Sequence, residues 1–267
     1  MAKGNDGNYL QHSVEVAVAA HLTTQDTKGR LHIALTHGMA PFEACGEVPD
    51  GQAKKLLHEA LCAAQHAPTD AEPSIVTAYR KTNAALSHYP NTGELLWAIV
   101  GGNRLSGGIT ECDPQKYEQL RDAWSCSGVM PVRSSWRAQV IPGGVLMAPE
   151  PLHAPWLYSM DPMTYREEGY ADDNNIYHAD QGRIGAAITS FVKSGKPGVA
   201  ALFVYAVKPG VRERFWSFVD DLAKQTNTTH ESCWLTHLGG NRNLAALLCS
   251  AFILPSNWLP HGLNAGH

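Results

Sequence analysis

Apolar residues recur along the chain with two periods, and each period predicts a different kind of element. Six segments place apolar residues three to four positions apart, as on one face of an α-helix. These are 8–22, 50–66, 92–102, 114–124, 183–195 and 211–225. Shorter runs that are apolar throughout or alternate with polar residues are typical of strands. These are 31–37, 106–111, 128–135, 154–161, 198–207, 233–239 and 244–255.

Strands and helices alternate through most of this order, which indicates a mainly parallel sheet with helices on both faces. The last two strand segments follow each other closely and predict an antiparallel pair at the C-terminus. Residues 67–79 hold two prolines and several small polar residues, which indicate a linker or the base of an insertion. We expect an α/β fold, with one doubly wound domain over 1–267 and a small helical insertion at 45–90.

In doubly wound sheets, ligands bind beyond the carboxyl ends of the strands. The residues that directly follow the predicted strands are therefore the first candidates for a site. They are His37 and Gly38, Glu111 and Asp113, Ser134 to Trp136, and Asp161 to Tyr165.

The stretch "GGITECDPQKYEQL" at 107–120 allows two interpretations of its acids. Asp113 followed by Pro114 is a good helix start, with a side-chain cap and a proline at the first helical position. An acid at the end of a strand, here Glu111, can instead hold the two hydroxyls of a nucleoside ribose. Both interpretations can hold at once, because they concern different residues.

Composition and charge narrow the classes of function. Six cysteines form no CxxC pair, and thirteen histidines form no HExxH or HxH cluster, so we expect no metal site. The net charge of −4 lowers the expectation of a large nucleic-acid footprint. The chain has no apolar run long enough to span a bilayer and no secretion signal at its start, so we expect a soluble, cytoplasmic protein that binds no membrane.

A series of short motifs occurs in the same order as in one known family. The motifs are "KGNDGNYLQHSV", "ALTHGMAPFE", "YPNTGELL", "ITECDPQKYEQLR", "YSMDPMTYRE", "VYAVKPGVRERF" and "LAALLCSAFILPSNWL". In this order the chain resembles the bacterial large-subunit ribosomal RNA adenine-N6 methyltransferases of the J type. Those enzymes use S-adenosylmethionine and have a Rossmann-like fold with a helical insertion, which the resemblance implies here.

The resemblance also implies a set of cofactor-binding residues. Glu111 would hold the ribose hydroxyls of S-adenosylmethionine by charge-assisted hydrogen bonds. His12, His37 and Thr92 would line the methionine end. Gln11 stands where the family has a lysine that meets the cofactor carboxylate, so this contact would be weaker here.

The same resemblance implies a catalytic pair after the fourth parallel strand. Asp161 would accept a hydrogen bond from the amine that is methylated. Tyr165, or Thr164 by strict register, would stack on the target base. Methyl transfer needs little acid–base chemistry, because alignment and a free lone pair supply most of the rate.

Four departures from the family pattern bear on the cofactor pocket and on the substrate. Leu35 stands where the family has an acid after the first strand, and the glycine-rich loop is reduced to Gly38 with Pro41. Ser135 stands where an acid contacts the adenine, and "DPMTY" is one residue longer than the family's catalytic tetrapeptide and lacks its second proline. These losses favour an alternative, in which a degenerate methyltransferase-like protein serves as a partner-binding or ligand-sensing module.

Other polar and aromatic positions have both a structural and a functional interpretation. Asp180 is expected to cap the following helix rather than to serve as a second catalytic acid. The run "DDNN" at 172–175 is expected to be a solvated loop within a longer substrate lid. Trp136, Trp156 and Tyr158 are expected in the core rather than in a pocket.

The pattern and the resemblance together predict a methyltransferase that uses S-adenosylmethionine and acts on an amine nitrogen. The target is adenine N6 in RNA or DNA, as the resemblance implies, or a nitrogen of a small molecule or peptide. The sequence gives no oligomeric state.

Overall fold

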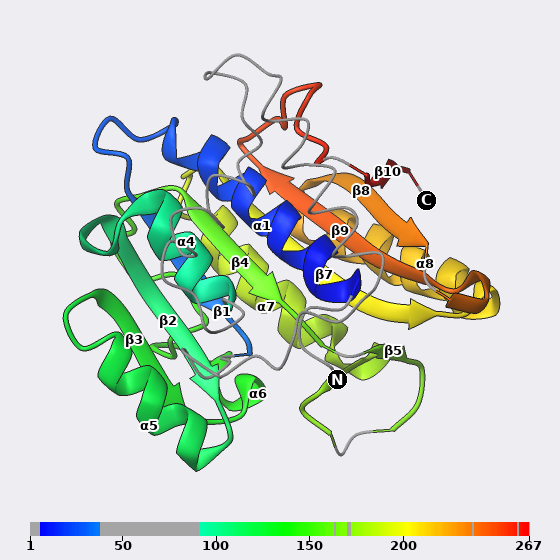
Figure 1. The fold of residues 1–267 in the computed structure, drawn as a ribbon, viewed down its shortest axis with the longest axis horizontal. Coiled ribbons are helices and arrows are strands. Elements are labelled where there is room, and N and C mark those ends of the chain that lie inside the picture. The colour runs from blue at the N-terminus through cyan, green and yellow to red at the C-terminus, as the bar shows by residue number, and fades with distance from the viewer. Residues whose placement is uncertain are drawn as a thin grey trace.

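The structure is a computed structural model, and it describes residues 6–37, 91–162, 164–169, 172–236, 238–260 and 262–266. Within these ranges the chain forms an eight-stranded sheet with helices packed on both of its faces (Figure 1). The expected helix at 50–66, the linker at 67–79 and the insertion at 45–90 lie outside the described residues.

The described helices and strands match the expected segments closely. The helices are α1 (Asp6–Thr23), α4 (Thr92–Val100), α5 (Pro114–Ala123), α6 (Trp136–Gln139), α7 (Gln181–Val192) and α8 (Pro209–Thr226). The strands of the main sheet are β1 (Leu31–Leu35), β2 (Leu105–Glu111), β3 (Gly128–Arg133), β4 (Trp156–Met160), β7 (Gly198–Val207), β8 (Thr229–Thr236), β9 (Arg242–Ser250) and β10 (Asn264–Ala265). A separate pair, β5 (Thr164–Arg166) and β6 (Asn175–Tyr177), lies where a loop was expected.

The strand order is β10-β8-β9-β7-β4-β1-β2-β3. The pairs β1–β2, β2–β3, β1–β4 and β4–β7 are parallel, whereas β9 is antiparallel to both β7 and β8. The expected α/β class, the doubly wound Rossmann-like sheet and the antiparallel C-terminal pair are confirmed. The chain passes from β1 outward to β2 and β3 and then returns to β4 on the other side of β1. The carboxyl ends of β1 and β4 therefore flank the point where ligands bind in such sheets.

Two apolar cores lie on the two faces of the sheet, because successive strand residues point to opposite faces. In β1, Leu31, Ile33 and Leu35 face the core beneath α1, α4 and α5, and Ala34 faces the core beneath α6, α7 and α8. The α1 helix is buried from residue 9 to residue 19, and this stretch holds Gln11, His12, Ser13 and Glu15 among its apolar residues. Among the described helices, none combines the length and the apolar character that a membrane span needs.

Trp136, Trp156 and Tyr158 each expose no more than 1% of their surface, so their assignment to the core is confirmed. Trp156 stacks on Phe191 of α7 and donates its indole N–H to the Lys196 carbonyl over 3.0 Å. Gly198 pairs with Trp156 across the β4–β7 ladder. A Cβ atom at residue 198 would lie 2.1 Å from the indole ring, so only glycine fits there.

We therefore expect Gly198→Ala to lower the free energy of unfolding by about 1–3 kcal/mol, the usual cost of overpacking. Urea denaturation followed by far-UV circular dichroism measures this change. The matched control is Gly182→Ala in α7, where the added Cβ meets nothing within 4 Å. The control should be neutral or slightly stabilising, because alanine favours helix more than glycine does. Equal stabilities for the two variants would contradict this account of the β4–β7 contact.

Candidate functional site

The carboxyl ends of β1, β2, β4 and β7 meet α1 and the first turn of α4, and polar side chains gather there. The central one is Glu15 of α1, which is 1% exposed. It accepts hydrogen bonds from the hydroxyls of Ser159 in β4 and Thr92 in α4, the latter over 2.7 Å, and from the Gln11 amide over 3.4 Å. Burial raises the pKa of Glu15 to about 8, so the acid is mostly protonated near neutral pH.

Asp161 follows β4 and is partly buried beside this network. The Tyr205 hydroxyl donates to Asp161 Oδ1 and lies 3.3 Å from Oε1 of Gln11. Burial raises the pKa of Asp161 to about 6, and the hydrogen bond from Tyr205 opposes this rise. Asp161 is therefore ionised at neutral pH and can accept a hydrogen bond, whereas Glu15 holds its proton.

A narrow cavity joins several of the residues that the sequence predicted for the site. Gln11, His37, Thr92 and Asp161 border it, together with apolar side chains from the ends of β1, β2 and α5. Burial lowers the pKa of His37, so this imidazole is neutral near pH 7. The structure thus brings together polar groups that lie far apart in the sequence and leaves Asp161 as the ionised group among them.

Glu111 and Asp113 have separate roles at the end of β2. Asp113 accepts hydrogen bonds from the backbone N–H groups of Gln115 and Lys116 over 2.8 and 3.0 Å, and Pro114 begins α5. The helix-start interpretation of Asp113 is therefore confirmed. Glu111 is only partly buried and accepts the Asp113 N–H at Oε1 over 2.9 Å. Burial raises the pKa of Glu111, and the side chain lies at the strand end where a ribose acid was expected.

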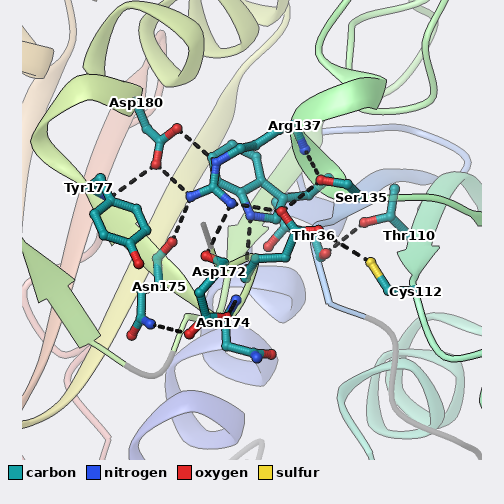
Figure 2. Close-up of polar contacts among 12 residues, drawn as sticks. Thr36, Thr110, Cys112, Ser135, Arg137, Asp172, Asn174, Asn175, Tyr177 and Asp180 are labelled. Carbon is teal, nitrogen blue, oxygen red and sulfur yellow. Dashed lines mark hydrogen bonds and ion pairs between the residues drawn. The ribbon is translucent and has the colours of Figure 1, made fainter. Parts of the chain in front are cut away.

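A second polar cluster is built around Arg137 of α6 (Figure 2). Its guanidinium forms a fork with both oxygens of Asp180, over 2.9 and 2.7 Å, and it also bonds Asp173 over 2.7 Å. Asp180 is 0% exposed and additionally accepts the Tyr177 N–H. Because a bidentate arginine–carboxylate pair is rigid, Arg137 fixes the segment 172–180 against α6.

Asp173 extends from this segment to the ends of the first three strands. Its carboxylate accepts hydrogen bonds from Ser135 over 2.7 Å and from the Cys112 thiol over 3.4 Å. Its carbonyl oxygen lies 2.9 Å from His37 Nε2 and 3.2 Å from Trp136 Nε1. The segment 172–175 therefore closes over the carboxyl ends of β1, β2 and β3.

These contacts correct several expectations. The run at 172–175 is not a solvated loop. Asn175 is 4% exposed, and its side-chain amide donates a hydrogen bond to the carboxylate of Asp172. Asp180 lies at the start of α7, but its side chain does not cap that helix, because Arg137 takes both of its oxygens. Ser135 caps α6 and binds Asp173, so its hydroxyl is already engaged.

Tyr165 was expected to stack on a target base, and the structure places it elsewhere. It is 3% exposed and packs against Phe215 and Phe218 of α8, with its hydroxyl 3.2 Å from His178 Nδ1. A ring that is 3% exposed offers no free face to a base in this arrangement, so the structure does not favour the expected stacking role of Tyr165. Thr164, the alternative by strict register, is partly exposed.

The remaining predicted residues are a buried histidine and a glycine. His12 is 1% exposed on α1, and burial lowers its pKa to about 3, which keeps the imidazole neutral. Gly38 lies outside the described residues. Burial raises the pKa of Cys112 to about 11, so this thiol at the end of β2 stays protonated and is not an activated nucleophile.

Sequence reasoning missed the residues that connect the site: Glu15, Ser159, Tyr205, Arg137 and Asp173. One signal was available for Glu15, because an acid inside the apolar run "SVEVAVAA" must be buried and needs hydrogen-bond partners. No pattern in the sequence links the segment around Asp173 to the ends of β1, β2 and β3, since that link depends on tertiary packing.

Comparison with known proteins identifies the fold. Protein LPL1258 from Legionella pneumophila str. Philadelphia 1, family-model DUF519, superposes with a TM-score of 0.63 at 15% identity, over 96% of this chain and 90% of that one. TYW2 of M. jannaschii, solved in complex with AdoMet, gives a TM-score of 0.41 at 9% identity, over 93% of this chain and 78% of that one. No family model and no curated protein sequence matches the chain. The likeness to LPL1258 shows a shared fold over nearly the whole of both chains.

The raised pKa of Glu15 makes a prediction for stability. The unfolded chain releases this proton near its ordinary pKa of 4.5 and the folded chain only near about 8, so stability should fall as pH rises between those values. The slope from this group is at most about 1.4 kcal/mol per pH unit. Glu15→Gln has no such proton, so its stability relative to the wild type should increase from about pH 5 to about pH 8.

Urea denaturation at a series of pH values tests this. The control is Glu118→Gln, which removes an exposed acid paired with Arg121 on the surface of α5 and should follow the wild-type pH dependence. If the free energy of unfolding of Glu15→Gln follows the same pH dependence as that of the wild type, Glu15 is ionised in the folded protein.

Proposed function

We propose that the protein is a methyltransferase that uses S-adenosylmethionine and acts on an amine nitrogen. The observation that carries the proposal is the ionised Asp161 at the end of β4, across the topological switch point from Glu111 at the end of β2. A nucleoside cofactor and a nitrogen substrate need polar groups on these two sides of the same crevice.

The polar side chains at this site have the chemistry that S-adenosylmethionine needs. Glu111 is a partly exposed carboxylate that can accept from ribose hydroxyls. Gln11, Thr92 and His37 are uncharged polar groups that border one cavity with Asp161, and they would exchange their present hydrogen bonds for contacts to the zwitterionic methionine end. When bound, the cofactor supplies an electrophilic methyl group, so that an N–C bond forms as the C–S bond breaks and the nitrogen loses a proton.

The role of the protein in this reaction is alignment. Asp161 has one oxygen held by Tyr205, which leaves Oδ2 to accept an N–H of the substrate. This hydrogen bond would turn the nitrogen lone pair toward the methyl group, and orientation of this kind supplies much of the barrier reduction in such transfers. Because Asp161 has a pKa of about 6, it can also take the proton that the nitrogen releases.

Two arginines, Arg212 and Arg242, favour an anionic substrate such as RNA or DNA over a small amine. Val207 at the end of β7 pairs with Arg242 at the start of β9, so Arg242 lies on the same edge of the sheet as Asp161. Its guanidinium lies 3.6 Å above the Trp234 ring, and burial, together with the nearby charge of Arg212, lowers its pKa. Clustered arginines and an aromatic ring are typical of surfaces that bind single-stranded nucleic acid.

A second candidate function is a ligand-sensing module without methyl transfer. The contacts of Asp173 favour it, because they already engage Ser135 and Cys112 where the nucleoside end of the crevice would lie. Two experiments distinguish the enzyme from the sensor. The first is calorimetric titration with S-adenosylmethionine and S-adenosylhomocysteine, and the second is a radiolabelled methyl-transfer assay with RNA and DNA oligonucleotides. Binding with transfer supports the enzyme, binding alone supports the sensor, and absence of binding to either compound contradicts both.

If Glu111 holds ribose hydroxyls, Glu111→Ala should weaken S-adenosylmethionine binding by roughly 1.5–3 kcal/mol, the range for hydrogen bonds to a charged group. Isothermal titration calorimetry measures this loss as about a 10- to 150-fold rise in Kd. Glu118→Ala on the exposed side of α5 is the control and should bind as the wild type does. Unchanged affinity in a folded Glu111→Ala protein would remove Glu111 from the cofactor site.

If Asp161 aligns the nitrogen, Asp161→Asn should keep cofactor affinity and lose turnover by about 100-fold or more. The asparagine has nearly the same shape but carries no charge and places an N–H donor where an acceptor is needed. Initial rates of methyl transfer at saturating cofactor measure the effect. Parallel losses of binding and turnover would mean that Asp161 supports the cofactor pocket instead of the reaction.

A further inference from the structure

The strand that carries Tyr205 is irregular at the point where it reaches the site. The β7–β9 register shifts between Val204 and Val207, which marks a β-bulge. Ala206 has a φ of 50°, a left-handed conformation that costs free energy in any residue with a side chain. Bulges next to functional sites commonly change the direction of a side chain.

A buried asparagine stabilises this conformation. Asn243 of β9 is 2% exposed, and its Oδ1 accepts the Ala206 N–H over 2.8 Å. This hydrogen bond satisfies a backbone donor that the register shift would otherwise leave without its ladder partner. The bulge is thus a specific feature of the strand that the packing of β9 supports.

The consequence of the bulge is the position of the Tyr205 hydroxyl. It donates to Asp161 Oδ1 and lies 3.3 Å from Oε1 of Gln11, so it joins the end of β4 to α1. We propose that Tyr205, directed by the β7 bulge, is the positioning residue that fixes the Asp161 carboxylate for the target nitrogen. The proposal rests on the proposed function for its role in the reaction, and on the structure alone for the control of Asp161.

Among the described residues, three titratable groups lie near Asp161 on the elements packed against it: Glu15 on α1, His37 after β1 and Tyr205 on β7. Burial raises the pKa of Glu15 to about 8 and lowers that of His37, so burial disfavours the charged form of both groups. Burial and the charge of Asp161 raise the pKa of Tyr205, which therefore keeps its proton for donation. Within the described part of the chain, Tyr205 is the neighbour whose removal should change the titration of Asp161 most.

The experiment is a ¹³C NMR pH titration of the full chain with labelled aspartate carboxyls, in which Asp161→Asn identifies the Asp161 resonance. Tyr205→Phe removes the donor and should move the titration of Asp161 upward by about one to two pH units. The matched control is Tyr158→Phe in β4, because its buried hydroxyl has no hydrogen-bond partner among the described residues. The control should leave the Asp161 titration unchanged.

A second variant keeps the test decisive if Tyr205→Phe does not fold. Asn243→Ala removes the acceptor of the Ala206 N–H and should shift the Asp161 titration in the same direction. An unchanged Asp161 titration in a folded Tyr205→Phe or Asn243→Ala protein overturns the proposal. A shift in the control as large as in the Tyr205→Phe variant overturns it as well.

Kinetic and binding measurements separate this proposal from the proposed function. With methyl transfer established, Tyr205→Phe should lower kcat at neutral pH, leave the Kd for S-adenosylmethionine within about three-fold, and shift the pH profile with the titration of Asp161. Failure of the wild type to bind the cofactor contradicts the methyltransferase. Failure of the Asp161 titration to respond to Tyr205→Phe contradicts the positioning role alone.

Discussion

The site depends on the buried carboxyl group of Glu15. It takes hydrogen bonds from Ser159 of β4, Thr92 of α4 and Gln11 of its own helix, so one side chain joins three elements at the edge of the sheet. A charged acid in this position would be costly, and protonation removes most of that cost. The network also sets the environment of Asp161, since Gln11 connects Glu15 to the Tyr205–Asp161 pair.

The division between the two acids follows from their surroundings. Glu15 has almost no exposed surface and lies in an apolar helix, whereas Asp161 is partly exposed and accepts a hydrogen bond from a tyrosine that keeps its own proton. The two carboxyl groups belong to one network, but they differ in burial and in hydrogen bonds. Their pKa values therefore differ, at about 8 for Glu15 and about 6 for Asp161. The result is one ionised acceptor beside a neutral acid in the same network.

On the other side of the crevice, Arg137 has a comparable structural role. It has a bidentate contact with the fully buried Asp180 (Figure 2). This contact anchors the segment that carries Asp173 to the ends of β1, β2 and β3. This segment engages Ser135, the residue that stands where an acid was expected from the family pattern. The structure therefore brings a carboxylate from a distant part of the chain to the end of β3, which lacks one in its own sequence.

The sequence by itself determined the types of element, their order and the local features at their ends. The strand 198–207, the Asp113–Pro114 helix start and the antiparallel C-terminal pair depend on residues that are close in sequence, so periodicity and capping chemistry predicted them. Only the tertiary structure decided which side chains meet. It buried Tyr165 against α8, took Asp180 as the partner of Arg137 and connected Glu15 to Asp161 through Gln11 and Tyr205. These contacts join residues far apart in the chain, and the packing of helices on a sheet places such residues together without leaving a local pattern in the sequence.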